Sequence, residues 1–300
     1  MAGGERRVTG WPMRAAVLGH PIGHSLSPVL HRAAYQALGL TGWRYDALDV
    51  TAEGLSAFVA GLDASWAGLS LTMPLKQAVL PLLDHVEPQA EVVGVVNTVL
   101  VQATGGRPVL TGANTDVHGI VAALNEGEVG ATGEPSGTGR GPAGRLAVVL
   151  GAGATAASAL AALAQVGCPA PSVHARSMAR AGATIRAAHR MGVDASFRAL
   201  DLTRTVAALA AADVVVSTLP PGAADAVAAG LTGPVHGVLL DCAYHPRPTA
   251  LVRAWQRCGG IAVSGERMLL HQAGEQVRLM TGRDAPLDAM DAALRSALAR

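Results

Sequence analysis

Lys76 is the residue of this chain whose type most directly suggests proton chemistry. It is the only lysine among 23 lysine and arginine residues, so the other 22 are arginines. An arginine stays protonated, whereas a lysine amine can release and regain a proton in suitable surroundings. We therefore predict that Lys76 acts as a general acid and base. The alternative is a surface lysine that has survived by chance.

The residues before Lys76 predict a strand, a turn and a helix. The apolar run at residues 67–71 is typical of a short buried strand, and Thr72 can cap the turn that follows. Pro74 suits the first helical position, and the helix is predicted to continue over residues 76–83. Lys76 would then lie in the first helical turn after the carboxyl end of a strand. Open α/β sheets bind their ligands at that end.

Two serines accompany another predicted helix start. A strand at residues 15–18 leads into a turn, and Ser27 followed by Pro28 is typical of a helix N-terminus. The hydroxyls of Ser25 and Ser27, together with backbone N–H groups at the positive end of the helix dipole, are suited to bind a carboxylate. The alternative is structural, with Ser27 capping the helix and Ser25 shaping the turn.

Amide and carboxylate side chains form a further pattern. The chain has three asparagines, and two of them stand in Asn–Thr pairs, at Asn97 and Asn114. The second pair is followed by Asp116. Delivered from loops after strands, such side chains suit a small ligand that carries several hydroxyl groups. The alternative is ordinary turn and cap chemistry, for which Asn and Asp are also preferred.

A glycine-rich loop follows a buried strand in the second half of the chain. The strand predicted at residues 146–150 leads into Gly-Ala-Gly-Ala-Thr-Ala at residues 151–156, and a helix is predicted to residue 167. This is the G-x-G-x-x-G/A pattern in the strand, turn and helix setting that it requires. It predicts a dinucleotide whose pyrophosphate lies at the helix N-terminus.

The next predicted strand ends without the acidic residue that would bind a free ribose 2′-hydroxyl. The strand at residues 173–175 is instead followed by Arg176 and Ser177, and Arg180 comes one helical turn later. Two guanidinium groups favour a 2′-phosphate, which predicts NADP over NAD. The alternative is that both arginines are solvated surface residues.

The chain is long enough for two α/β domains. We predict a substrate-binding domain over residues 13–125 and a Rossmann-like, doubly wound NADP-binding domain over residues 145–264. Residues 126–144, with seven glycines, are predicted to be a flexible linker or insertion. Helices over residues 265–300 are predicted to return to the first domain.

Composition excludes several classes of partner. A net charge of +1 argues against nucleic acid, and no apolar run is long enough for a membrane helix. The three cysteines form no CxxC pair and the histidines show no metal-ligand spacing, so no metal is expected. We predict a cytoplasmic protein, a monomer or homodimer, whose partner is a small-molecule substrate.

These motifs, in this order, resemble the shikimate dehydrogenase family over residues 14–283. The resemblance rests on segments that lie far apart in the chain and on the glycine loop. The segments are Pro21-Ile22-Gly23-His24-Ser25-Leu26-Ser27-Pro28, Thr72-Met73-Pro74-Leu75-Lys76, Gly94-Val95-Val96-Asn97-Thr98, Asn114-Thr115-Asp116-Val117-His118-Gly119 and Gly265-Glu266-Arg267-Met268-Leu269-Leu270-His271-Gln272.

The resemblance implies an NADPH-dependent, reversible reduction of 3-dehydroshikimate to shikimate in aromatic amino-acid biosynthesis. It implies that Lys76, paired with Asp116, protonates the alkoxide that forms as hydride reaches the carbonyl group. Ser25 and Ser27 would hold the substrate carboxylate, with Tyr244 nearby. The residues implied around the ring hydroxyls are Thr72, Lys76, Asn97, Asp116 and Gln272.

The resemblance also implies a set of residues for NADP. They come from the glycine loop, the end of the next strand, the loop at Thr218, and the residue directly after the predicted domain. They are Gly151, Ala152, Gly153, Ala154, Thr155, Arg176, Ser177, Arg180, Thr218 and Gly265, the last expected near the nicotinamide.

The chain departs from the family pattern at three places. The family often has Asn where Ser70 stands and usually has Asn where Ala175 stands, and the stretch at 126–144 looks longer than the family needs. The nearest alternative is a quinate or dual quinate/shikimate dehydrogenase. A non-catalytic NADP-binding sensor is a further one. A folate-linked methylene dehydrogenase would not explain the two serines.

Overall fold

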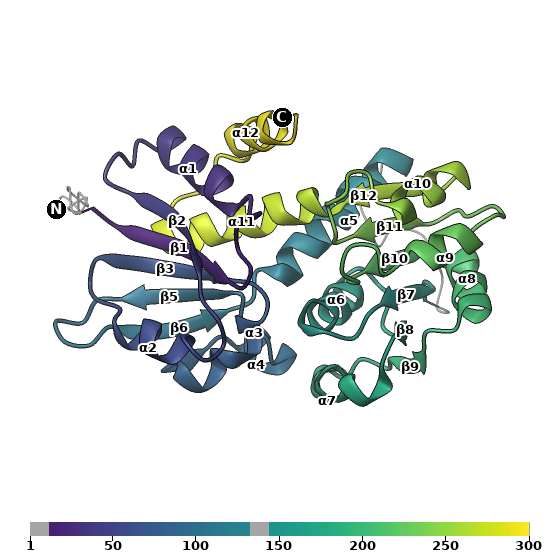
Figure 1. Ribbon diagram of the computed structural model, residues 1–300, viewed down its shortest axis with the longest axis horizontal. Helices are drawn as coiled ribbons and strands as arrows, with labels where there is room; N and C mark the ends of the chain where they lie inside the picture. The colour runs from purple at the N-terminus through teal and green to yellow at the C-terminus, as the bar shows by residue number, and fades with distance from the viewer. Residues whose placement is uncertain (1–11, 133–143, 300) are drawn as a thin grey trace, which may run out of the picture. The chain divides into compact units, whose positions relative to one another are not determined.

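The computed structural model describes residues 12–132 and 144–299, which divide into two compact units (Figure 1). The first unit comprises the chain up to Val86, the segment Val96–Ala113 and the chain from Gln276 onward. The second unit comprises Glu87–Val95 and Asn114–Glu275. The functional domain boundaries given above stay predictions.

The first unit is built on a mixed sheet with the strand order β2-β1-β3-β5-β6-β4. Strand β1 pairs in parallel with β2 and β3, whereas β5 runs antiparallel to both of its neighbours. The strands predicted at residues 15–18 and 67–71 are confirmed. The strand bounds are β1 Arg14–Gly19, β2 Arg44–Asp49, β3 Trp66–Leu71, β4 His85–Val86, β5 Thr98–Gln102 and β6 Val109–Ala113.

The helices of the first unit are shorter than their sequence patterns suggest. The helix predicted over residues 76–83 is an α-helical turn followed by a 3₁₀ turn, because Pro81 has no N–H group to continue the α-helical ladder. Helix α2 begins only after Gly54, whose N–H group donates to the Thr51 hydroxyl oxygen. The helix bounds are α1 Ser27–Ala37, α2 Leu55–Ala60, α3 Leu75–Ala78, η1 Leu80–Leu82 and α12 Leu287–Leu298.

Three aromatic residues and a histidine gather in the core of the first unit. His31 stacks on Tyr45 with ring centroids 3.9 Å apart, and Tyr35 meets both His31 and Trp43 edge to face. Helix α1, which carries His31 and Tyr35, packs against α12. The chain from Gln276 onward is therefore part of this core.

The second unit is a parallel sheet with the strand order β12-β11-β10-β7-β8-β9. In chain order this is 6-5-4-1-2-3, the doubly wound arrangement that binds dinucleotides where the strand order reverses, between β7 and β10. The predicted α/β fold class with a Rossmann-like domain is thus confirmed. The strand bounds are β7 Ala147–Leu150, β8 Ser172–Ala175, β9 Ser196–Ala199, β10 Val214–Ser217, β11 Val238–Asp241 and β12 Ile261–Ser264.

Successive residues of β7 show why this sheet carries helices on both faces. Ala147 and Val149 pack in one hydrophobic cluster with residues of α5 and α6, whereas Val148 and Leu150 pack in a second cluster with residues of α8, α9 and α10. The helix bounds are α4 Pro88–Val93, α5 Asp116–Thr132, α6 Ala154–Gln165, η2 Met178–Arg180, α7 Gly182–Met191, α8 Leu202–Ala211, α9 Asp225–Gly230, α10 Ala250–Arg257 and α11 Gly265–Thr281.

The predicted linker at residues 126–144 is wrong for its first part. Helix α5 continues to Thr132, and its glycine at position 127 packs closely on the sheet. A Cβ atom on Gly127 would lie 2.6 Å from Val263 Cγ2 and 2.8 Å from Val238 Cγ1. Residues 133–143 lie outside the described residues. Within the described residues, no helix is long and apolar enough to cross a membrane.

Candidate active site

The predicted residues of the first unit gather at one edge of its sheet. Parallel strands β1 and β3 end side by side there, and the Thr72 N–H group donates to the Leu18 carbonyl at 2.9 Å. Gly19 allows this approach, because a Cβ atom at that position would lie 2.3 Å from Thr72 Cγ2. The carboxyl ends of the two strands thus bring the loops of Ser25 and Lys76 to the same edge.

Lys76 lies in α3, five residues after Leu71, the last residue of β3, as predicted. Its side chain is half-buried, and its carbonyl accepts a hydrogen bond from Val96 N at 2.9 Å. Pro74 occupies the N-cap position, one residue earlier than predicted, and Thr72 binds the turn through its carbonyl oxygen, which accepts from Leu75 N. Backbone hydrogen bonds at Leu75 N and at Lys76 O therefore anchor the helix.

Ser27 is not the cap of α1, so the capping part of that alternative is wrong. The helix begins at Ser27 and Leu26 holds the N-cap position without a side-chain hydrogen bond. The Ser25 hydroxyl instead accepts a bond from Ser27 N at 3.3 Å. The Ser27 hydroxyl is buried and hydrogen bonds to the Tyr45 hydroxyl, whose pKa is raised by burial.

Asn97 stands directly before β5, at the same edge. Its carbonyl accepts from Leu71 N at 2.7 Å, and its side-chain Oδ1 accepts from the Thr98 hydroxyl at 2.9 Å. Because β5 runs antiparallel to β3, with Ser70 opposite Thr98, the start of β5 meets the end of β3. The structure therefore brings Thr72, Lys76 and Asn97 to one edge, as an α/β site requires.

The second Asn–Thr pair has a different role. Asn114 Oδ1 accepts from Val117 N at 3.3 Å, and its Nδ2 donates to Val95 O and to the Ser158 hydroxyl, both at 3.0 Å. Asn114 therefore caps α5 and ties it to α6, which confirms the turn and cap interpretation at this position. Asp116, the first residue of α5, is fully buried.

Gln272 comes from α11, the partner of α5 in the second unit. The two helices meet at Gly119, where a Cβ atom would lie 2.7 Å from Met268 O and 3.0 Å from Gln272 Cβ. Asp116 lies one helical turn before Gly119, so it shares the face of α5 that meets α11. The close helix contact thus places Asp116 and Gln272 on facing helices.

Tyr244 lies in the loop after β11, half-buried. Burial and the negative charge of Glu266 raise the pKa of its hydroxyl. The same loop is tied to α11 by Arg247, whose Nε lies 2.8 Å from Glu266 Oε1. Glu266 is buried, so this ion pair holds the Tyr244 loop against the first turn of α11.

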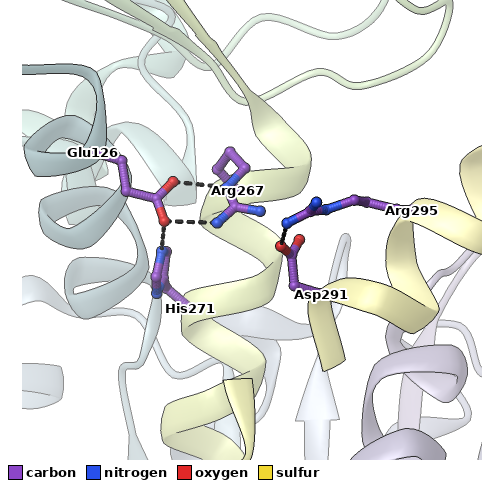
Figure 2. Close-up of polar contacts among 5 residues, drawn as sticks. All are labelled: Glu126, Arg267, His271, Asp291 and Arg295. Atoms are coloured by element: carbon purple, nitrogen blue, oxygen red, sulfur yellow. Dashed lines mark hydrogen bonds and ion pairs between the residues drawn. The ribbon is translucent and has the colours of Figure 1, made fainter. Parts of the chain in front are cut away.

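A charged cluster that sequence reasoning missed joins α5 to α11. Figure 2 shows the Glu126 carboxylate between Arg267 and His271. The Arg267 guanidinium donates from Nε to Glu126 Oε2 and from Nη2 to Glu126 Oε1, both at 2.7 Å. His271 Nε2 also lies 2.7 Å from Glu126 Oε1. Partial burial raises the pKa of Glu126, but the bonds from Arg267 and His271 outweigh it and lower the pKa to about 2. His271 of this cluster directly precedes Gln272, so the cluster fixes the rotation of α11 about its axis.

We expect this cluster to make stability depend on pH. A lowered carboxyl pKa adds stability above about pH 4.5, and that contribution is lost as the pH falls toward 2. Glu126→Gln should lower Tm at pH 7 by roughly 2–4 °C, a value limited by solvent screening, and the difference from wild type should shrink below about pH 4. Asp46→Asn, which breaks the exposed pair with Arg32, is the control and should change little. A pH-independent difference would contradict the prediction.

The glycine loop has the geometry of a phosphate-binding turn. Gly151 has φ of +105°, and a Cβ atom there would lie 2.5 Å from the hydroxyl oxygen of Thr218. Thr218 follows β10 and donates to Leu150 O through both its N–H and its hydroxyl group. Gly153 is the N-cap of α6 without a side-chain bond, and a Cβ atom there would meet nothing within 4 Å. The first amides of α6 are thus open to an anionic group, which fits a pyrophosphate.

Thr184 supports this loop and was not predicted. Its hydroxyl is buried in the first turn of α7 and contacts Ala152 O at 2.8 Å and Gly153 O at 3.3 Å. These bonds fix the two loop carbonyls and so turn the neighbouring N–H groups toward the open side. The sequence signal is weak, because a threonine in a first helical turn usually serves its own helix.

The three residues predicted for the 2′-phosphate stand together after β8. Arg176 follows the strand directly and is exposed, Ser177 is half-buried, and exposed Arg180 ends the 3₁₀ turn η2. Gly265 begins α11 after β12, where a Cβ atom would lie 2.3 Å from Cys242 O. The predicted NADP residues therefore all follow the carboxyl ends of strands of the second sheet.

Gly151→Ala should lower NADPH affinity and stability by more than the backbone strain at this position alone would cause. The added methyl group has no space beside Thr218, so we expect NADPH affinity to fall more than tenfold and stability to fall by about 1–3 kcal/mol. Gly192→Ala is the matched control, because Gly192 also has positive φ, at +66°, but a Cβ atom there would meet nothing within 4 Å. Titration of NADPH fluorescence measures both. Equal affinities of the two variants for NADPH would contradict the prediction.

No group of three or more His, Cys, Asp or Glu side chains within residues 12–132 and 144–299 is placed to hold a metal ion. Within the described residues no disulfide bond joins the cysteines, and Cys168 is buried. Burial raises the pKa of the Cys168 thiol to about 11, which disfavours the thiolate.

Two family models match the chain. Residues 17–99 match the shikimate dehydrogenase substrate binding domain, and residues 265–295 match the shikimate 5′-dehydrogenase C-terminal domain. The shikimate dehydrogenase (NADP(+)) of Methanothermobacter thermautotrophicus is 34% identical, with 100% of each chain covered.

Solved structures of shikimate and quinate dehydrogenases are also similar to the chain. The crystal structure of Mycobacterium tuberculosis shikimate dehydrogenase is 39% identical, with a TM-score of 0.80 over 95% of this chain and 100% of that chain. A quinate dehydrogenase from Corynebacterium glutamicum, solved in complex with NAD, is 29% identical, with a TM-score of 0.79 over 96% and 100% of the two chains.

Proposed function

Since the chain belongs to the shikimate dehydrogenase family, we infer that it is an NADP-dependent oxidoreductase that acts on a CH–OH group. It catalyses the reversible reduction of 3-dehydroshikimate to shikimate with NADPH, a step of aromatic amino-acid biosynthesis. The observation that carries this conclusion is similarity to an NADP-dependent relative over the whole length of both chains.

Residues of the first unit bind the substrate. Ser25 and Ser27 hold its carboxylate at the start of α1, where the N–H groups and the helix dipole favour negative charge. Thr72 and Asn97 bind ring hydroxyl groups from the edge where β3 ends and β5 begins. Tyr244, Asp116 and Gln272 are the other proposed substrate-binding residues.

Lys76 is the proposed proton donor. In reduction, its ammonium group gives a proton to the carbonyl oxygen of the substrate as that oxygen gains negative charge. In oxidation, the neutral amine takes the proton of the substrate hydroxyl. Asp116 is its proposed partner in the proton transfer. An arginine could not serve, because it does not release its proton.

The second unit holds the cofactor. Gly151, Ala152, Gly153, Ala154 and Thr155 present N–H groups to the pyrophosphate, Arg176, Ser177 and Arg180 bind the 2′-phosphate, and Thr218 and Gly265 shape the remaining surface. NADPH, when bound, supplies the hydride that the carbonyl carbon receives.

Initial rates with shikimate and with quinate, each with NADP and with NAD, test this function. We expect the highest kcat/KM for shikimate with NADP. A preference for quinate with NAD would identify the alternative dehydrogenase. Protein that binds NADPH but turns over neither substrate would support the sensor instead. The cytoplasmic location and the monomeric or homodimeric state stay predictions.

A further inference from the structure

Six buried polar side chains of the first unit form one connected network. They come from α1, β2, β3, the start of β5 and α11, and each is at most 7% exposed. They are Ser27, Tyr45, Ser70, Asn97, Thr98 and Gln276. Two of them, Ser27 and Asn97, are proposed substrate-binding residues, and they lie at the two ends of the network.

The hydrogen bonds on one side of the network run from Ser27 to Gln276. The Tyr45 hydroxyl forms a hydrogen bond with the Ser27 hydroxyl and donates to Ser70 Oγ at 2.6 Å. The Ser70 hydroxyl in turn donates to Gln276 Oε1 at 2.9 Å. Helix α11 can reach Ser70 because β3 has a glycine at position 68. A Cβ atom on Gly68 would lie 2.9 Å from Met280, one helical turn after Gln276.

The bonds on the other side run from Gln276 to Asn97. Gln276 Nε2 donates to the Thr98 hydroxyl oxygen at 3.1 Å, and the Thr98 hydroxyl donates to Asn97 Oδ1 at 2.9 Å. The side-chain oxygen of Asn97 is thus directed to Thr98. Its NH₂ group therefore lies on the opposite side of the amide from this contact.

His31 completes the environment of Gln276. Burial lowers the pKa of His31 to about 3, so the ring is neutral and carries one N–H group. Gln276 Oε1 can only accept, and His31 Nε2 lies 3.2 Å from it, so the proton is on Nε2. Both acceptor sites of the Gln276 oxygen are therefore occupied by donors, which fixes the orientation of its amide.

We propose that Gln276 and Thr98 are positioning residues of the substrate site, which join Ser27 to Asn97 through this buried network and orient the Asn97 amide toward a substrate hydroxyl group. The proposal rests on the proposed function, since it assigns the ligand of Asn97 as shikimate. Neither residue needs to touch the substrate. Their effect is on substrate affinity through the geometry of Asn97.

Thr98→Val removes the hydroxyl while it keeps the side-chain shape. We expect KM and Kd for shikimate to rise roughly tenfold, with KM for NADP unchanged, because one hydrogen bond that holds Asn97 is lost. Thr98→Ser, which keeps the hydroxyl, should restore values close to wild type. Shikimate binding, followed by calorimetry without cofactor, gives a readout that does not depend on turnover.

Thr205→Val is the matched control for general loss of stability. Thr205 is also fully buried, and its hydroxyl is 2.8 Å from His174 Nδ1 in the second unit. It should lower Tm as Thr98→Val does but leave shikimate affinity unchanged. Equal losses of affinity in the two variants, or unchanged affinity in Thr98→Val, would overturn the proposal. If Thr98→Val does not fold, Ser70→Ala decides by the same two criteria. A wild-type protein that neither binds nor turns over shikimate would instead overturn the proposed function.

Discussion

Replacing Lys76 with alanine lowers kcat for shikimate oxidation by roughly 10²- to 10⁴-fold and changes KM for shikimate little. This is the expected effect of losing a general acid and base that acts mainly in the transition state. The half-buried position of Lys76 beside the strand ends allows the substitution without a core cavity. Steady-state kinetics, with Tm as a check on folding, measure the effect.

Lys76→Arg separates proton transfer from simple charge. Arginine keeps the positive charge and similar reach but does not release its proton, so we expect this variant to be nearly as slow as Lys76→Ala. Gln77→Ala, at the exposed neighbouring position, is the control and should keep the wild-type kcat. A Lys76→Arg enzyme within tenfold of the wild-type kcat would show that the amine only supplies charge.

The pairing of Lys76 with Asp116 is open to a double-mutant cycle. If the two act as one unit, Asp116→Asn and Lys76→Ala together should slow kcat little more than Lys76→Ala alone. Independent effects that multiply would remove Asp116 from the proton-transfer step. The cycle measures the coupling of the two residues through kcat, so it does not require knowledge of how the substrate is bound.

The strands and the glycine loop could be predicted because their signals are local. An apolar run such as residues 147–150 is buried on both faces in any parallel sheet, and glycines at positions 151 and 153 are required by the turn itself. The site at the end of β3 was predictable for the same reason, because Thr72 and Lys76 follow one short buried strand.

Contacts between distant segments could not be predicted in this way. Gln276 meets Ser70 from 206 residues away, and Arg267 meets Glu126 from 141 residues away. The glycines at 127 and 130 made the end of α5 look like a linker, but Gly127 serves close packing on the sheet. Local patterns also misplaced the cap of α1, because Ser27 bonds to Tyr45 in the core rather than to its own helix.

Arg176→Ala should raise KM and Kd for NADPH by roughly 10- to 100-fold and change those for NADH less than about twofold. Charge-assisted hydrogen bonds to a phosphate account for a loss of this size, and NADH has no 2′-phosphate to lose. Arg198→Ala, on the neighbouring strand β9, is the control, because it removes an exposed arginine that donates a hydrogen bond to the Ser196 hydroxyl oxygen. Equal weakening of both cofactors would refute the phosphate role.

Arg176→Asp extends this test from loss to reversal. The end of β8 is where a dinucleotide-binding domain places either a carboxylate for ribose hydroxyl groups or a cation for a 2′-phosphate. A carboxylate there repels the phosphate and accepts from the ribose of NADH, so kcat/KM should fall for NADPH and rise for NADH. Arg180 remains in η2 and still attracts the phosphate, so the double variant with Arg180→Ala should shift the preference further. If NADH is not favoured in either variant, the cofactor preference is set elsewhere than at this turn.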